Sequence, residues 1–259
     1  IAATYRMNGD APDMQSLRFE GTLNASCITP RDIACFVPQL RSFDMPLALS
    51  IGFNGTGNSL NVSHLNIENI DHSFIFNAKA HVLRNAQTIW HAEVSRLFAS
   101  NETIGSVYKT ITSNELPDIV NRLGDVSLTA KSGGTDADGS LSTQLNCATG
   151  SIKLTAAKKQ KTMRAHVETH KFELGKLLNS DKAGIVSLSL DAQGSSKNNI
   201  GVNGSIYDIS FNNYTYRNIN LKADYINKAL NGSATIDDPN LRATVEGLFE
   251  HRSPTPHLR

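Results

Sequence analysis

Two histidines stand four residues apart in this sequence, with a glutamate between them: His166, Glu168 and His170. Imidazole and carboxylate groups are common zinc ligands, and a zinc protease has its glutamate directly after the first histidine on a helix. Here Ala165 and Val167 alternate with the polar residues instead. This spacing predicts a strand whose polar face carries both histidines, and it predicts no metal site.

Two acidic turns are the next candidates for chemistry. Asp136-Ala137-Asp138-Gly139 begins like a calcium-binding loop, but no glutamate stands at its twelfth position. Asp237-Asp238-Pro239-Asn240 is typical of a tight turn. The sequence contains no glycine-rich phosphate loop before a helix and no serine in a nucleophile elbow. We therefore predict no catalytic residue, no metal and no cofactor.

The sequence has three cysteines, Cys27, Cys35 and Cys147, and this small, odd number does not fit a disulfide framework. One disulfide remains an open alternative, and Cys27 with Cys35 is the nearer pair. Because free cysteines are commonly buried, we expect three small, buried or half-buried apolar side chains.

Composition argues against nucleic acid as a partner. The 25 basic and 24 acidic residues give a net charge of +1, and the richest basic cluster is Lys158-Lys159-Gln160-Lys161, which is typical of a solvated turn. Affinity for phosphate depends on clustered lysine and arginine. The 259 residues suffice for one large all-β unit or two ordinary domains.

The sequence itself shows no export signal and no membrane anchor. Residues 1–16 lack a basic start followed by an apolar run. No stretch approaches the roughly 20 apolar residues that span a bilayer. Because patterned sequence begins at Ile1, we expect a piece of a longer protein whose anchor or signal lies outside it.

Alternation of apolar and polar residues with a period of two dominates the chain and predicts strands. The first turn is expected at Asn54-Gly55-Thr56-Gly57. The earlier alternating sets occupy residues 17–25, 47–53, 60–67, 74–82, 90–94, 126–130, 141–147 and 152–156.

Alternation is clearest in the last third of the chain, from Val186 to Gly247. Asn212-Asn213 predicts a two-residue hairpin loop with positive φ. The apolar parity changes at Arg217-Asn218, which predicts a β-bulge, and a turn is expected at Asn227-Lys228. Together these signals indicate an antiparallel meander of about sixteen strands.

Helical signals are short and lie between strand blocks. We expect helices at about 29–40, where Thr29 and Pro30 form a start signal, at about 100–123 and at about 172–179. We divide the chain into a β-meander over residues 1–125 and a β-repeat segment over residues 126–259, within one continuous unit.

One face of the predicted strands carries Ala, Leu, Ile, Val and Gly, and the other carries Asn, Ser, Thr, Asp and Lys. A meander with one apolar face must hide that face. The fold class is therefore all-β, and three arrangements stay open: a closed barrel, a sandwich, or a groove filled by an apolar guest.

Several segments resemble the TamB family of the AsmA-like superfamily in its Bacteroidetes form, and the resemblance covers nearly the whole chain. Its motifs are structural, so it identifies no catalytic residue. The segments are Leu23–Asn54, Phe172–Leu178, Val186–Asp191, Asn203–Ser205, Phe211–Ile219, Leu230–Gly232 and Ile236–Leu241.

The resemblance implies a long protein that is anchored in the inner membrane by one N-terminal helix and spans the periplasm. Its β-rich repeats would curl into a taco-shaped groove with an apolar interior. It implies phospholipid transport between membranes and assembly of outer-membrane proteins with a barrel partner. The expected partners are phospholipid acyl chains, outer-membrane barrel proteins and the rest of the longer chain.

Such a groove needs small and aliphatic residues of one parity, which would leave room for acyl chains. The groove candidates are Phe74, Phe76, Ala78, Ala80, Val186, Leu188, Leu190, Ile209, Phe211, Ile219, Leu221, Ala223, Ala234, Ile236, Ala243 and Val245.

The main alternative is a secreted β-sandwich that binds carbohydrate or acts as an adhesin. Such a module needs an aromatic platform, and Tyr207, Tyr214, Tyr216 and Tyr225 would have to supply it. Because these tyrosines alternate with core aliphatic residues, we interpret them as packing residues. An enzyme is the least favoured class.

Overall fold

The chain forms one antiparallel sheet in which strand order follows chain order, from β1 to β16. The computed structural model describes residues 1–9, 11–33, 35, 41, 44–196, 199–226, 229–250 and 257–258. The predicted all-β meander is confirmed. Contacts group the chain into two compact units, Ile1–Asp136 and Ala137–Arg259, whereas the sequence placed the division after residue 125.

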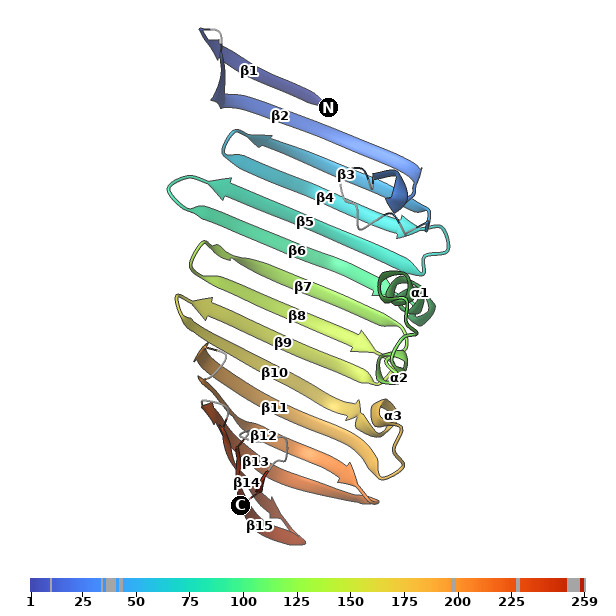
Figure 1. Cartoon of the computed structure of the whole chain (residues 1–259), viewed down its shortest axis with the longest axis vertical. Coiled ribbons are helices and arrows are strands. Elements are labelled where there is room, and N and C mark those ends of the chain that lie inside the picture. The colour runs from blue at the N-terminus through green and yellow to red at the C-terminus, as the bar shows by residue number, and fades with distance from the viewer. Residues whose placement is uncertain are drawn as a thin grey trace. The chain divides into compact units, whose positions relative to one another are not determined.

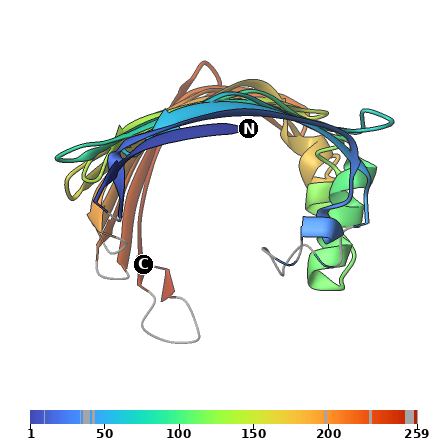
Figure 2. The same ribbon diagram turned by 90° about the horizontal axis from the view of Figure 1, so that it is seen from above.

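The first unit combines long strands with short helices (Figure 1). In Figure 2, the strand ends that lead into its helices bend toward the side on which those helices lie. Its described elements are β1 (Ala2–Asn8), β2 (Ala11–Ile28), η1 (Pro30–Ile33), β3 (Leu47–Thr56), β4 (Ser59–Asn69), β5 (Phe74–Arg84), β6 (Thr88–Ala99), α1 (Asn101–Thr112), α2 (Asp118–Asn121) and β7 (Val126–Thr135).

The second unit is a run of strands interrupted by one short helix within the described residues (Figure 1). Its elements are β8 (Gly139–Cys147), β9 (Gly150–Lys159), β10 (Thr162–Glu173), α3 (Leu174–Leu178), β11 (Ala183–Ser196), β12 (Asn199–Phe211), β13 (Tyr214–Ile226), β14 (Ala229–Asp238), β15 (Leu241–Glu250) and β16 (His257–Leu258).

The described helices fall within the ranges where the sequence placed them. Within the expected range 29–40, Thr29 is not helical, η1 is described as helical and Cys35 lies in a turn, and residues 34 and 36–40 fall outside the described residues. The range 100–123 contains two helices. The first, α1, starts where the Ser100 side chain accepts a hydrogen bond from the Thr103 amide and ends at left-handed Ser113, and a second helix follows Pro117.

Turn chemistry explains most strand boundaries. Asn212 and Asn213 have φ of 50° and 63°, which confirms the predicted hairpin loop. Asn218 has φ of 53°, at the predicted change of parity. The turn expected at Asn54–Gly57 lies later in the chain, at Gly57-Asn58, because β3 runs on to Thr56, whose hydroxyl lies 2.9 Å from that of Ser59 across the turn. The expected turn at Asn227-Lys228 lies outside the described residues.

Some glycines are required because a ring from the neighbouring strand lies over them. A Cβ atom on Gly21 would stand 2.7 Å from the Phe53 ring, and one on Gly133 would stand 2.5 Å from the His91 ring. Either contact is too short for a side chain to fit without moving the ring. Glycine thus lets β2 and β7 pair closely with strands that carry large rings on the same face.

A buried carboxylate closes the β13–β14–β15 end of the second unit. Asp238 is only 1% exposed. Its Oδ1 accepts hydrogen bonds from the Tyr214 hydroxyl and from the Asn240 amide (3.0 Å), and its Oδ2 accepts from the Arg217 amide (3.0 Å). The Tyr214 hydroxyl, followed by the Asn240 and Arg217 amides, lowers the pKa of Asp238, and the carboxylate raises the pKa of Tyr214. One carboxylate therefore fixes two turns and the start of β13.

We expect Asp238→Asn to lower the stability of the chain, because an amide nitrogen cannot accept the hydrogen bonds that a carboxylate oxygen accepts. Since folding lowers the pKa of Asp238 from 3.8, its contribution is complete above that pH and is lost as the pH falls through the folded-state pKa. Urea unfolding from pH 7 to about pH 3 should show a gap between wild type and variant that shrinks at acid pH. A gap independent of pH would contradict this role.

Candidate apolar binding face

Strand register brings apolar residues of the second unit into rows across one face. Leu190 faces Gly204, Gly204 faces Leu221, Leu221 faces Ala234, and Ala234 faces Val245. Directly opposed residues point to the same side of a sheet. A single apolar row therefore crosses five strands.

Two parallel rows flank this one on the same face. Together with the row from Leu190 to Val245, these two flanking rows define what we call the apolar face of unit 2. The first flanking row consists of Leu145, Ile152, Thr169, Leu188, Ile206, Ile219, Ile236 and Ala243. The second flanking row consists of Leu141, Ala156, Ala165, Ala192, Val202, Ala223, Gly232 and Gly247.

The first unit has a comparable apolar face. Ile67 faces Phe76, Phe76 faces Leu97, and Leu97 faces Leu128. Hydrogen bonds between Asn69 and Ser73 (2.7 Å) and between Ser73 and Thr103 (2.8 Å) place the first turn of α1 at the end of this face. The apolar face of unit 1 also includes Leu49, Ile51, Phe53, Val62, Leu65, Phe74, Ala78, Ala80, Val82, Trp90, Ala92, Val94, Ala99, Val126 and Ala130.

The structure distributes the groove candidates over these two faces. Phe74, Phe76, Ala78 and Ala80 lie on the apolar face of unit 1. Phe211 ends β12 opposite Ala183 and Tyr214, outside the rows that reach β14 and β15. On or directly beside the rows of unit 2 lie Val186, Leu188, Leu190, Ile209, Ile219, Leu221, Ala223, Ala234, Ile236, Ala243 and Val245.

The parity assigned to Tyr207 in β12 is wrong. Val186 faces Ile209, but Leu188 faces Ile206, so β12 has an extra residue between these two positions. Ile206 therefore joins the apolar face, and Tyr207 is 53% exposed. Tyr216 and Tyr225 face Ile209 and Ile200, which puts them on the apolar side. The four tyrosines do not share one exposed platform.

Little of the described chain covers the apolar faces. Val245 is 59% exposed, and the principal contacts join strands that are neighbours in the sheet, with α3 adding contacts to β11. The apolar side chains that are buried among the described residues are Ile75, Phe172, Val186 and Ile219.

The opposite faces are mainly polar, and some of the charges on them are paired. In unit 1, Glu93 lies between Lys79 and Lys131, with N–O distances of 3.1 Å and 3.6 Å. The hydrogen bond from Lys79 is the main cause of the lowered pKa of Glu93. In unit 2, His166 Nδ1 lies 2.9 Å from Asp191 Oδ1. The prediction that a polar strand face carries both histidines is confirmed for His166; His170 is exposed and lies where the register shifts between Thr169 and Phe172.

Ser50 and His64 lie close together on the polar face of unit 1 but are not arranged as a catalytic pair. Ser50 Oγ donates to Asn24 Oδ1 at 2.7 Å and lies 3.2 Å from His64 Nε2. A catalytic serine would instead give its proton to the histidine, which a carboxylate would orient. Within the described part of the chain, no group of three or more His, Cys, Asp or Glu side chains is arranged to hold a metal.

The cysteines differ from expectation. Cys27 and Cys35 are exposed and Cys147 is half-buried, and all three are free thiols. The prediction of buried or half-buried side chains is therefore correct only for Cys147. Cys27 lies near the end of β2, close to where that strand stops pairing with β3 at Ile28 and Leu47, and this position leaves its side chain open to solvent.

Comparison with known proteins gives no relative: no family model, curated protein or solved structure matches this chain. Among the described residues no helix is both long and apolar enough to cross a membrane. The resemblance to the TamB family stays a prediction.

Two neighbouring substitutions on β13 test whether the apolar face is uncovered. Ile219 is buried, so Ile219→Ala should lower the free energy of unfolding by about 2–5 kcal/mol. Leu221 lies in the uncovered row, so Leu221→Ala should lower the free energy of unfolding by only about 1 kcal/mol, because folding buries little apolar surface at this position. Urea unfolding measures both. An equal, large loss at Leu221 would show that another layer covers it.

Proposed function

We propose that this chain holds the acyl chains of lipids against its apolar sheet faces and performs no catalysis. The observation that carries the proposal is the set of continuous apolar rows, which little of the described chain covers. Apolar area of this extent is unfavourable in water and typically marks a binding surface.

Hydrogen bonding favours acyl chains over a polypeptide guest on this face. The backbone N–H and C=O groups of the strands are used in the sheet ladders, as the registers of β11 to β15 show. The amide groups of a polypeptide lying on the face would find few partners, at a cost of about 1–3 kcal/mol for each buried group. A methylene chain has no such groups and gains about 0.8 kcal/mol per buried CH₂.

The side chains also leave room for a guest. The row from Ala156 to Gly247 consists mainly of Ala and Gly, and it runs between the Leu221 row and larger residues such as Met163 and Leu230. With strands about 4.8 Å apart, a row from β9 to β15 is about 29 Å long. One leaflet of a bilayer has a hydrocarbon depth of about 15 Å, so the row is long enough for an extended acyl chain.

The absence of charged side chains from these rows favours low selectivity among lipids. The proposal includes a periplasmic location, transport of phospholipid between membranes and assembly of outer-membrane proteins with a barrel partner. The resemblance to the TamB family supports these three points. The carbohydrate-binding alternative based on tyrosines gains no support, because Tyr216 and Tyr225 lie among apolar residues.

Native mass spectrometry with lipid extraction tests the proposal on two adjacent positions of β14. Ala234 lies on the apolar face, opposite Leu221 and Val245, whereas Ser233 lies on the polar face, opposite Lys222 and Glu246. Ala234→Arg should reduce bound phospholipid by about tenfold, since a charged group is costly against acyl chains. Ser233→Arg introduces the same charge one residue away and should leave binding unchanged.

Circular dichroism must show both variants folded. Equal binding by wild type and Ala234→Arg would remove this row from the lipid site. No bound phospholipid on the wild-type chain, after incubation with vesicles of phosphatidylethanolamine and phosphatidylglycerol, would contradict the proposed function itself.

A further inference from the structure

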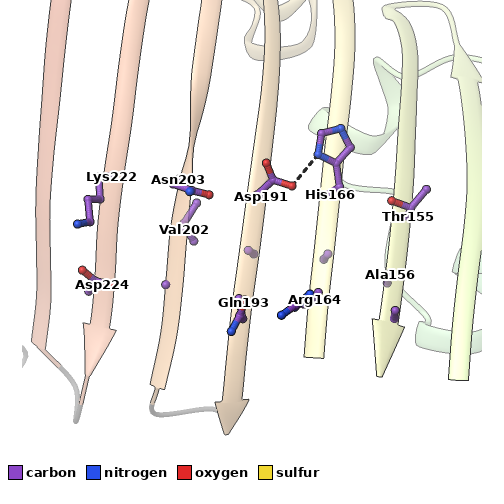
Figure 3. A pocket seen from close by; sticks show the side chains of 14 residues that line it. Thr155, Ala156, Arg164, His166, Asp191, Gln193, Val202, Asn203, Lys222 and Asp224 are labelled. Carbon is purple, nitrogen blue, oxygen red and sulfur yellow. Dashed lines mark hydrogen bonds and ion pairs between the residues drawn. The ribbon is translucent and has the colours of Figure 1, made fainter. Parts of the chain in front are cut away.

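The polar side chains around one hollow of unit 2 are not used by the proposed function (Figure 3). The volume of this hollow is about 520 Å³, within the range of roughly 300–1,000 Å³ that is typical of small-molecule sites. It extends across β9 to β13. The polar side chains that line it are Thr155, Arg164, His166, Asp191, Gln193, Asn203, Lys222 and Asp224.

Strand register builds the hollow from two adjacent rows. In the first, His166 faces Asp191, Asp191 faces Asn203, and Asn203 faces Lys222. In the second, Arg164 faces Gln193, Gln193 faces Gly201, and Gly201 faces Asp224. The hollow depends on Gly201, because a Cβ atom there would lie 3.0 Å from Asp224 Oδ1. Glycine thus keeps open the floor between the polar side chains.

The polar groups around this hollow have unused hydrogen-bonding capacity. Asp191 bonds to His166 through Oδ1 at 2.9 Å, which fixes the carboxylate in place. Elsewhere on the polar face, side chains pair with each other, as Ser205 does with Asn220 at 2.8 Å. Within the described chain, no side-chain hydrogen bond or ion pair engages Arg164, Gln193, Asn203, Lys222 or Asp224.

The charges in the hollow balance. Arg164 and Lys222 are cationic, and Asp191 and Asp224 are anionic. An anionic ligand would meet two carboxylates and a cationic ligand would meet two cations. A hydroxyl group both donates and accepts, so adjacent hydroxyls can use the carboxylates, the amides and the guanidinium together.

We propose that this hollow binds a neutral saccharide. No phenylalanine, tyrosine or tryptophan side chain is among its lining residues, so the affinity rests on hydrogen bonds to solvated groups and should be weak, with a Kd of about 1 mM. The hollow shares Ala156, Ala165, Ala192 and Val202 with the small-residue row of the apolar face. The proposed saccharide contacts come from the polar side chains, which lie outside that row, so either proposal can fail without the other.

Titration of the full chain with cellobiose and with N,N′-diacetylchitobiose, followed by NMR of the backbone amides, tests the site. We expect at least one of these neutral probes to shift amides of β9 to β13 around Asp191 and Gly201. Gly201→Val should weaken binding by about tenfold because it fills the floor, and Asp224→Ala should do so without adding volume. Thr235→Val, an isosteric change on the same polar face outside the hollow, should leave the affinity unchanged.

Three results would overturn the site. The first is no amide shift with either saccharide at concentrations well above 1 mM, roughly ten times the expected Kd. The second is unchanged affinity in both Gly201→Val and Asp224→Ala. The third is tighter binding of inorganic phosphate than of either saccharide, which would show an anion site instead.

Discussion

A sheet one layer thick has no interior, and this constraint determines the rest of the structure. Each strand satisfies its backbone groups through its two neighbours, as between Leu221, Gly204 and Ala234. Side chains are then divided between two faces, and nothing in the ladder itself keeps water from the apolar one. The fold is held by ladders, cross-strand packing and turn networks rather than by a central core.

Irregular positions keep each face uniform along strands that are longer than usual. The extra residue of β12 between Ile206 and Ile209 and the left-handed Asn218 of β13 lie at the same level, so pairing between these strands stays in register. Without such positions, a change of parity in one strand would put polar side chains among apolar ones. Asp238 acts at the end of the same strands, where three hydrogen bonds hold the adjoining turns.

Local sequence predicted what depends on local rules. The period-two alternation predicted the meander and the face of Leu188 and Leu190, and the Asn212-Asn213 pair predicted its hairpin. The extra residue at Tyr207 was missed because nothing in the sequence around it marks a bulge. Exposure of Cys27 depends on where pairing between two strands stops, which one strand alone does not show.

The polar hollow lay beyond sequence reasoning for a related reason. Its residues come from five strands, and Gly201 lies beside Asp224 and Gln193 only because of the registers of β11, β12 and β13. Considered alone, each of these residues fits the pattern of an ordinary solvent-exposed residue in a strand. The apolar rows were easier to foresee, since every strand repeats the same pattern of alternation.

The most direct test of an uncovered, lipid-holding face is photo-crosslinking to phospholipid along one strand. A photoreactive residue would be placed in turn at each position of β11 from Leu188 to Gln193, in chain incubated with labelled phospholipid. The structure predicts crosslinks at Leu188, Leu190 and Ala192 and not at Ser189, Asp191 or Gln193. Crosslinking without this period of two, or none at any position, would contradict the account.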